Sequence, residues 1–324
     1  MRYYKAFIFF LLISSFLTGC RQEEFTNIPA ERDIAITVNI KEMSLSFIDI
    51  QAQKNIGSWK VNKAYTGGSV LSDGDTLLLY GEKLNTIDLY SLSKGELIHQ
   101  WTIGEGVVDV EELRPDTIVA LDERKNSVRF FNSNGEETSH IDIFDRPLEM
   151  KHDEARDELI IIGFDENLLT SIDLERMEIK ENYEIHTHAT GLFPLDNEIW
   201  VGGHGDGLDI EKYVHVYDRE TGKALRKISV PSMPVDFTKA DESIFVVSHG
   251  TNLLYKLNEA GEVIGEMSVT ANPFTIETFS DIVLVAGYDS SELQFIDSET
   301  IKLKGSVDVG EGPFQILLRE NEDS

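Results

Sequence analysis

The sequence is short of basic residues, of cysteine and of long hydrophobic runs. Its 324 residues include 29 Lys and Arg against 58 Asp and Glu, for a formal net charge of −29. Phosphate contacts need a basic surface, so this balance argues against a nucleic-acid partner and against electrostatic adhesion to an anionic membrane. The single cysteine excludes an intrachain disulfide and a cysteine-based zinc cage. The apolar run over residues 6–17 is shorter than the roughly 20 residues that span a bilayer.

The N-terminus has the pattern of an export signal. Arg2 and Lys5 precede the apolar run, and the segment LTGC ends at Cys20, the only cysteine. A positive start before a short apolar run is typical of secretory signals. The LTGC segment resembles the lipobox of bacterial lipoproteins, in which the thiol receives a diacylglyceryl group and the chain is cut just before it. The resemblance implies removal of residues 1–19 and a stable anchor of several acyl chains on Cys20.

This signal predicts an extracytoplasmic protein of the bacterial cell envelope, anchored to a membrane by the lipid on Cys20. An ordinary cleaved signal and an uncleaved anchor are the alternatives, although neither accounts for a lone cysteine at this position. Residues 20–32 are polar with one proline, and we expect a short tether there. Residues 320–324 are expected to be a tail.

The rest of the chain is one array of repeats. An alternating strand ends in Asp, Asn or Ser, a polar turn follows, and a second strand closes on Val or Ile. The residues that end the first of these strands recur at steps of 39 to 45: Asp49, Ser91, Asn132, Asp173, Asp218, Asn258 and Asp297. A further strand precedes each of them, and a Gly/Pro turn leads into the next apolar strand. Four short strands per unit at this period are typical of a β-propeller.

Seven repeats predict an all-β, seven-bladed β-propeller over residues 33–319. The last repeat lacks strands at the C-terminus, and residues 33–40 (DIAITVNI) have the register of a missing strand. One blade should therefore combine both ends of the chain, which closes the ring and removes free sheet edges. No stretch is left for a second domain. A helical repeat is the alternative, because residues 174–185 tolerate helix, but the period-two alternation elsewhere favours strands.

The repeats resemble the YVTN/YncE-like family of seven-bladed propellers, within the WD40-like and quinoprotein-like groups. The matching stretches are VGEGPFQILL at 309–318, VLVAG at 283–287 and FIDSET at 295–300. They are similar to the family's V-G-x-x-P, Y-V-A/T-N and V-I-D-x-x-T elements, although the literal YVTN string and the WD dipeptide are absent. The resemblance implies the fold, and it implies no single activity because fold does not determine function.

An oxygen-bearing residue stands two positions after the Gly/Pro turn in several repeats. These residues are Asp109, Glu149, Asp236, Thr275 and Gln315. The strand that follows this turn lines the axis of a propeller, so the three carboxylates are expected to converge and could hold Ca²⁺ or another hard cation. Lactonases of the SMP-30 type hold a divalent metal in such a channel to polarise a carbonyl and activate water. A water-filled channel lined by polar groups is the simpler interpretation.

A second candidate metal site lies in the repeat with the longest step, 45 residues. The extra residues fall in GGHGDGLDIEK at 202–212, which should share a face with the preceding segment IHTHATG. The candidate ligands there are His186, His188, His204, Asp206 and Asp209. Imidazole and carboxylate together suit Zn²⁺ or a general acid or base. A hydrated glycine-rich loop with incidental histidines is the alternative, because no rigid motif such as HExxH occurs.

The residues that follow the second strand of each repeat form a mixed ring that includes aromatic members. Phe164, His204, His249 and Tyr288 are candidates for a binding surface, because aromatic side chains are frequent anchors in recognition. No nucleophile elbow or P-loop is present. The leading hypothesis is a lipid-anchored binding or assembly module for an envelope or secreted protein or a small ligand, rather than an enzyme. The alternative is a metal-dependent hydrolase or lyase at the channel mouth, with Ca²⁺ or Zn²⁺, similar to SMP-30-like lactonases or streptogramin lyases.

Overall fold

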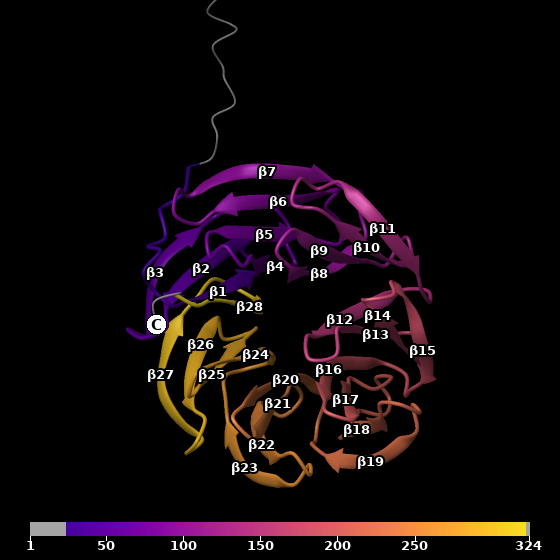
Figure 1. Cartoon of the computed structure of the whole chain (residues 1–324). Coiled ribbons are helices and arrows are strands. Elements are labelled where there is room, and N and C mark those ends of the chain that lie inside the picture. Colours follow the sequence, from indigo (N-terminus) through magenta and orange to yellow (C-terminus); the bar gives the residue numbers. More distant parts are fainter. Residues whose placement is uncertain (1–23, 322–324) are drawn as a thin grey trace, which may run out of the picture.

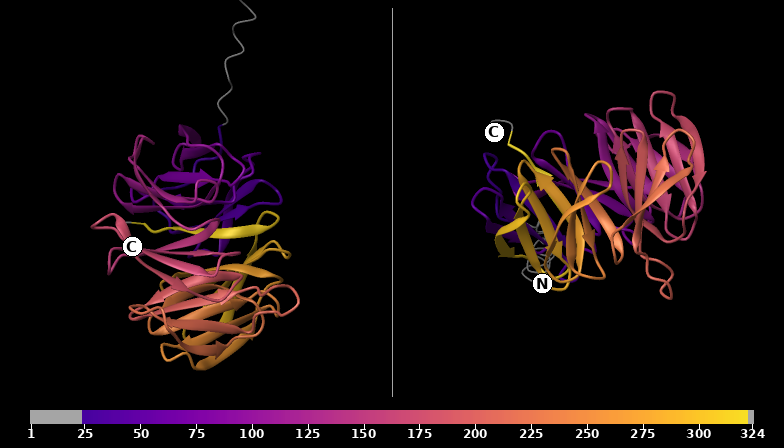
Figure 2. Two further views of the ribbon diagram at one scale, coloured as in Figure 1. Left: turned by 90° about the vertical axis from the view of Figure 1, so that its right-hand side faces the viewer. Right: turned by 90° about the horizontal axis from the view of Figure 1, so that it is seen from below.

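The computed structural model describes residues 24–321 and shows a closed ring of seven four-stranded antiparallel sheets. Figure 1 looks along the axis of the ring, with the sheets arranged as blades around it. The two side views of Figure 2 show the blades packed next to one another around the same axis. The prediction of a seven-bladed all-β propeller is confirmed. Residues 24–321 contain no helix long and apolar enough to cross a membrane.

Each blade has an inner strand at the axis, two middle strands and an outer strand at the rim (Figure 1). The inner strands are β4 (Gly67–Val70), β8 (Val107–Arg114), β12 (Pro147–Asp153), β16 (Ala189–Leu195), β20 (Pro234–Ala240), β24 (Pro273–Phe279) and β28 (Pro313–Arg319). The second strands are β5 (Thr76–Tyr80), β9 (Thr117–Asp122), β13 (Glu158–Gly163), β17 (Glu198–Gly203), β21 (Ser243–Ser248), β25 (Ile282–Gly287) and β1 (Ile34–Asn39).

The third strands contain or directly precede the recurring Asp, Asn or Ser of the repeats. They are β6 (Thr86–Ser91), β10 (Ser127–Phe131), β14 (Leu168–Asp173), β18 (Tyr213–Asp218), β22 (Leu253–Asn258), β26 (Glu292–Asp297) and β2 (Ser44–Asp49). The outer strands are β7 (Glu96–Thr102), β11 (Glu137–Asp142), β15 (Glu178–Glu184), β19 (Ala224–Ser229), β23 (Val263–Ser268), β27 (Lys302–Asp308) and β3 (Lys54–Trp59). We number the blades by these strands: blade 1 is β28-β1-β2-β3, blade 2 is β4–β7, and so on to blade 7, β24–β27.

Blade 1 joins the two ends of the chain, as the repeat count predicts. Strand β28 pairs antiparallel with β1, from Ile34 opposite Arg319 to Val38 opposite Gln315. This pairing gives the last inner strand its sheet partners and leaves the ring without an open seam. The second strands are almost wholly buried in every blade, because they are covered by the neighbouring sheets on both faces. Their near-continuous apolar sequences reflect this double coverage.

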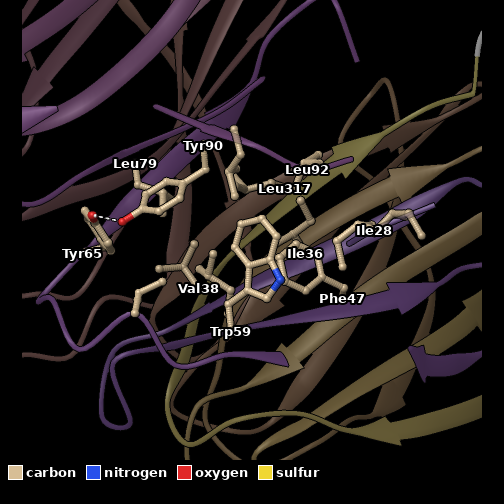
Figure 3. Close-up of a cluster of buried hydrophobic side chains, with 14 residues drawn as sticks. Ile28, Ile36, Val38, Phe47, Trp59, Tyr65, Leu79, Tyr90, Leu92 and Leu317 are labelled. Carbon is tan, nitrogen blue, oxygen red and sulfur yellow. Dashed lines mark hydrogen bonds between the residues drawn. The ribbon is translucent and has the colours of Figure 1, made fainter. Parts of the chain in front are cut away.

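The apolar core is divided into seven clusters that lie largely between neighbouring blades, and the cluster next to blade 1 is drawn in Figure 3. Trp59 lies at its centre, fully buried, with ring centroids 4.6 Å from Phe47 and 5.1 Å from Phe25. Glycine in the outer turns permits such contacts between blades. Gly135, at φ 78°, sits on the indole of Trp101, so any side chain there would collide with the ring.

The segment expected to be a short tether, residues 20–32, is packed on the ring from residue 24 onward. The amide of Phe25 donates to Gly95 O at 2.7 Å, and Ile28 is buried with its amide on Leu92 O at 2.9 Å. Trp59 Nε1 donates to Thr26 O at 2.8 Å. The expectation missed this because Phe25 and Ile28 are two isolated apolar residues in a polar stretch, whose partners lie in blades 1 and 2. Cys20 lies outside the described residues.

Candidate functional site

Most inner strands carry a β-bulge where they begin at one mouth of the channel. In β12, Pro147 pairs with Gly163 and Glu149 with Ile162, so the intervening Leu148 has no partner in the sheet. A bulge places two residues opposite one and redirects the extra side chain. The extra residues of the other bulged strands include Val108, Val235, Phe274 and Phe314. Each of them directly precedes one of the oxygen-bearing residues singled out from the sequence.

The extra residue of each bulge and the oxygen-bearing residue after it line one cavity. We call this cavity the funnel. It is a cavity of about 340 Å³, whose apolar wall contains Val108, Leu148, Phe164, Val235, Phe274 and Phe314. Its polar floor contains Asp109, Glu149, Lys151, Asp236, Thr275, Glu277 and Gln315. A second cavity of about 270 Å³ shares four of the floor residues, Asp109, Lys151, Glu277 and Gln315. These four residues therefore form the waist of the channel, with the funnel on one side.

The carboxylates expected to bind a metal instead accept hydrogen bonds from neighbouring inner strands. Asp109 accepts from the amide of Met150 at 3.1 Å, and Glu149 from the amides of Gly191 and Leu192 at 2.9 and 3.0 Å. Each inner strand is the edge of its sheet, so amides that point away from its single partner strand are free, and a carboxylate of the preceding blade satisfies them.

Asp236 and Gln315 do the same further round the ring. Asp236 accepts from the amide of Ile276 at 3.0 Å, and Gln315 Oε1 from the amide of Gly68 at 2.8 Å. Asp109, Glu149 and Asp236 thus lie in one channel and connect neighbouring blades. Among residues 24–321, the carboxylate oxygens of these three residues do not all lie within 4.8 Å of one another. Their spacing therefore does not mark them as a metal site.

Burial of these acids in the channel alters their protonation. Burial, helped by the charges of Asp236 and Asp109, raises the pKa of Glu149 to about 7. Burial likewise raises the pKa values of Glu277 and Glu111 to about 7, and those of Asp109 and Asp236 above their ordinary range. The low dielectric of a buried site disfavours the charged form.

Lys151 is the cation of this channel. It follows Glu149 by two positions on β12 and therefore points to the same side of the strand. Burial alone would lower its pKa, but the charges of Asp236, Glu149 and Glu277 raise it above its ordinary value. Lys151 therefore stays charged at neutral pH and partly compensates the acids at the waist.

An aromatic rim surrounds the opening of the funnel. Phe274 is central to it, with ring centroids 4.6 Å from His249, 5.4 Å from Phe314 and 5.8 Å from Tyr288. His204 lies 5.4 Å from His249 and 6.2 Å from Phe164. The four candidates for a binding surface, Phe164, His204, His249 and Tyr288, are thus joined into one surface. Phe274 and Phe314 complete it, and the sequence analysis missed them because only the bulge turns them toward the channel.

The five candidate ligands of blade 5 do not form one site. His188 packs edge-on against Phe164 at 5.1 Å and belongs to the aromatic rim, as does His204. Asp206 caps its own turn by accepting from the amides of Leu208 and Asp209 at 2.9 and 2.7 Å. That turn is exposed, and Leu208 at its tip has 97% of its surface accessible. The inserted loop thus uses Asp206 to stabilise its own turn, and the structure does not gather the five candidates into one ligand set.

His186 instead joins two residues that the sequence analysis did not single out, Glu211 and His215. The imidazole rings of His186 and His215 are stacked at 3.8 Å, and His215 Nε2 lies 3.1 Å from Glu211 Oε2. In the described part of the chain this is the group of three His or acidic residues whose ligand atoms all lie within 4.8 Å.

The protonation of this cluster is set by burial and by neighbouring dipoles. Burial, with the nearby His215, lowers the pKa of His186 to about 4. Burial alone would raise the pKa of Glu211, but His215 and the amides of Lys212 and Tyr213 lower it to about 2. At neutral pH His186 is therefore neutral and Glu211 ionised.

No known protein family and no curated protein matches the sequence. Solved structures match its fold at low sequence identity. A functionally unknown protein from Desulfotomaculum acetoxidans has a TM-score of 0.72 at 11% identity, over 89% of this chain and 99% of that one. The hydrazine synthase of Kuenenia stuttgartiensis has a TM-score of 0.70 at 12% identity, over 88% and 99% of the two chains.

Apo AztD from Citrobacter koseri is a further match, with a TM-score of 0.61 at 12% identity over 89% of this chain and 97% of that one. At such identities the likeness concerns the fold alone. The chain is a seven-bladed β-propeller similar to YVTN-type propellers, a fold found in binding proteins and in enzymes.

Proposed function

We propose that this protein is a binding module whose ligand enters the funnel and carries a positively charged group next to an apolar one. The observation that supports the proposal most directly is the aromatic rim above an acidic floor. Phe164, Phe274 and Phe314 supply apolar and π surfaces at the opening, and Asp109 and Glu149 lie one bulge position deeper. Pockets with apolar walls and a few convergent polar groups are the usual form of small-ligand sites.

The charge of the ligand follows from the floor. Asp109, Glu149 and Asp236 lie in one layer, and Lys151 lies two positions further along β12. An ammonium group held at the upper layer would gain from the three carboxylates and from the faces of the aromatic rings, at about 0.5–2 kcal/mol per cation–π contact. An anion would meet the same carboxylates and would be repelled. Both oxygens of Glu149 already accept backbone amides, so a metal in this channel would have to share these oxygens with the amides.

The funnel is tested with phenethylamine and phenethyl alcohol, which share an aromatic group and differ in charge. We expect the amine to bind and the alcohol to bind at least about tenfold more weakly, a difference of about 1.4 kcal/mol. Phe274→Ala should weaken binding of the amine by about five- to thirtyfold, because it removes the ring at the centre of the rim. Isothermal titration calorimetry at pH 8 measures the dissociation constants of the amine and of the alcohol.

Tyr213→Ala is the matched control, because Tyr213 is also an accessible aromatic residue but lies on β18, outside the residues that line the funnel. Its affinity for the amine should equal that of the unmodified protein. Equal affinity for amine and alcohol would contradict the cationic ligand. Equal weakening by Phe274→Ala and Tyr213→Ala would contradict the funnel as the site.

The proposal includes attachment to the outer side of a bacterial membrane through a lipid on Cys20, with a protein or small-molecule ligand of the envelope. It is supported by the sequence pattern before Cys20 and by the packing of the chain on the ring from Glu24 onward, four residues after Cys20. We expect mass spectrometry of the N-terminal peptide from expressing bacteria to find an acylated Cys20. Cys20→Ser should leave the protein unprocessed and unacylated, and an unmodified thiol in the unmodified protein would contradict the anchor.

A further inference from the structure

We infer that His186, Glu211 and His215 of blade 5 form a binding site for a transition-metal ion of the zinc class. The site is separate from the funnel, because none of these residues lines that cavity. It comprises two imidazoles and a carboxylate whose ligand atoms lie within 4.8 Å of one another. Such a donor set favours Zn²⁺, Cu²⁺ or Ni²⁺, whereas Ca²⁺ and Mg²⁺ prefer oxygen ligands alone.

The three residues come from separate parts of one blade. His186 lies in the connection from β15 to β16, Glu211 at the end of the inserted loop, and His215 within β18. The loop returns to the blade through the amide of Glu211, which donates to His204 O, and Glu211 O accepts from the amide of Met233 at 2.7 Å. These backbone bonds hold Glu211 beside β18, so the ligands are brought together by rigid parts of the structure.

Glu211 already has the orientation of a monodentate ligand. Its Oε1 accepts hydrogen bonds from the amides of Lys212 and Tyr213 at 2.9 and 3.0 Å. These bonds direct Oε2 toward His215 Nε2 at 3.1 Å. A metal-ligating carboxylate commonly has such an outer partner on its second oxygen, because the partner fixes the direction of the free lone pairs.

His186 shows the same pattern. His186 Nε2 lies 2.8 Å from Gly202 O, and because a carbonyl only accepts, this nitrogen carries the proton. The lone pair is then on Nδ1, which accepts from Tyr217 OH at 3.1 Å. A ligating histidine usually donates its other N–H to a carbonyl or carboxylate in this way. Binding of the ion requires the Tyr217 hydroxyl to move from the Nδ1 lone pair, and it requires one imidazole to turn, because the lone pairs of the stacked rings lie in nearly parallel planes.

His215 provides the second, independent observation. It has 8% of its surface accessible, and its buried Nε2 lies 3.1 Å from Glu211 Oε2 in a contact that falls outside good hydrogen-bond geometry. A buried polar atom whose close neighbour is poorly aligned gains less from that contact in the empty protein than from a well-aligned ligand. A metal bound between His215 and Glu211 would satisfy that nitrogen, whereas a purely structural stack of imidazoles would not.

Three protein ligands leave one position of a tetrahedral ion free for water or another exchangeable ligand. The side chain of Glu211 is 16% accessible, and the neighbouring loop over residues 206–210 is exposed. The ion could therefore enter and leave from the solvent side of the loop. This arrangement is typical of exchangeable or reactive metal sites more than of closed structural ones.

The test uses the full chain, stripped with a chelator and titrated with Zn²⁺ against a chromophoric competitor. We expect one equivalent of Zn²⁺ to bind and to raise the melting temperature, with no such effect from Ca²⁺. His215→Gln and His186→Gln should each weaken binding by more than about 100-fold, beyond the 10–100-fold typical of losing an outer partner. Titration with Co²⁺ should give visible d–d absorption in the unmodified protein that is absent from both variants.

Asp206→Asn and His249→Gln are the matched controls, because they change an acid of the same loop and a histidine of the rim. Both should bind Zn²⁺ as the unmodified protein does. The melting temperature of each metal-free variant reports whether it has folded. If a histidine variant does not fold, Glu211→Gln is tested in its place, because Glu211 is the more accessible ligand. Loss of the Co²⁺ spectrum in His249→Gln, or binding retained in both His186→Gln and Glu211→Gln, would overturn the site.

Discussion

Replacing Lys151 by Met is expected to lower the free energy of unfolding at pH 8 by about 3 kcal/mol, the lower end of the cost of removing one partner from a buried ionic group. Lys151 is the cation among the acids of the channel floor, where the charges of Asp236, Glu149 and Glu277 act on it most strongly. Without it, carboxylates that are ionised at pH 8 face one another in a site of low dielectric. The melting temperature should fall by roughly 6–12 °C.

The same substitution should cost much less at pH 5. Glu149, Glu277 and Glu111 have pKa values of about 7 in the folded protein against an ordinary 4.5, so they are mostly protonated at pH 5. A carboxylate with a raised folded pKa contributes stability that is complete below pH 4.5 and is lost as the pH rises through 7. The unmodified protein should therefore lose stability between about pH 4.5 and 7. Removal of Lys151 should make that loss steeper.

Urea unfolding at pH 5 and pH 8 measures the difference. Lys239→Met is the control on another inner strand, β20, because Lys239 forms an accessible ion pair with Glu259 and should contribute about 0–1 kcal/mol at either pH. Adding Glu277→Gln to Lys151→Met should restore part of the stability at pH 8, since it removes one of the repelling charges. An equal cost of Lys151→Met at both pH values would show that the loss comes from packing and not from charge.

Replacing Trp59 by Ala should destabilise the ring by about 3–5 kcal/mol and should detach the N-terminal segment. Trp59 is fully buried in the cluster drawn in Figure 3, and it contacts Phe47, Tyr90 and Phe25. Its Nε1 also donates to Thr26 O. The substitution leaves a cavity beside the blade that joins the two ends of the chain, and it removes the aromatic surface that holds residues 25–28.

Trp101→Ala is the control, because Trp101 occupies the same strand position in blade 2 and is also buried. It packs against Phe131 and Gly135 of blade 3 instead of the N-terminal segment. Both variants should melt at a lower temperature, but hydrogen exchange at the amides of Phe25 and Ile28 should accelerate only in Trp59→Ala. Equal protection of these two amides in both variants would contradict the role assigned to Trp59.

The proposed ligand and metal sites lie on the same side of the ring but use different chemistry. The funnel presents carboxylates that are already bonded to backbone amides, together with aromatic surfaces. The cluster of blade 5 presents nitrogen and oxygen ligands, among them a buried nitrogen that contacts a carboxylate in poor hydrogen-bond geometry. Failure of amine binding would remove the proposed function and leave the metal site untouched, and the reverse also holds.

The placement of functional residues could be predicted only in part. The assignment of Phe164, His204, His249 and Tyr288 to one face follows from strand order, because loops after every second strand share a side of a propeller. The structure joins them into one rim through Phe274. The grouping of His186 with His188 and Asp206 relied on nearness in the sequence, and it failed because loop 204–210 forms its own turn.

The sequence by itself determined the number of blades, the position of each strand and the closure of the ring. These depend on a period of about 41 residues and on alternation within short segments, and each repeat packs mainly against its neighbours. Only the tertiary structure decided which side chains meet at the channel and in blade 5. Bulges without a sequence signal turn Phe274 and Phe314 inward, and backbone bonds between loops bring Glu211 to His215. Such convergence depends on the curvature of whole sheets and on contacts between residues far apart in the chain, which local pattern does not specify.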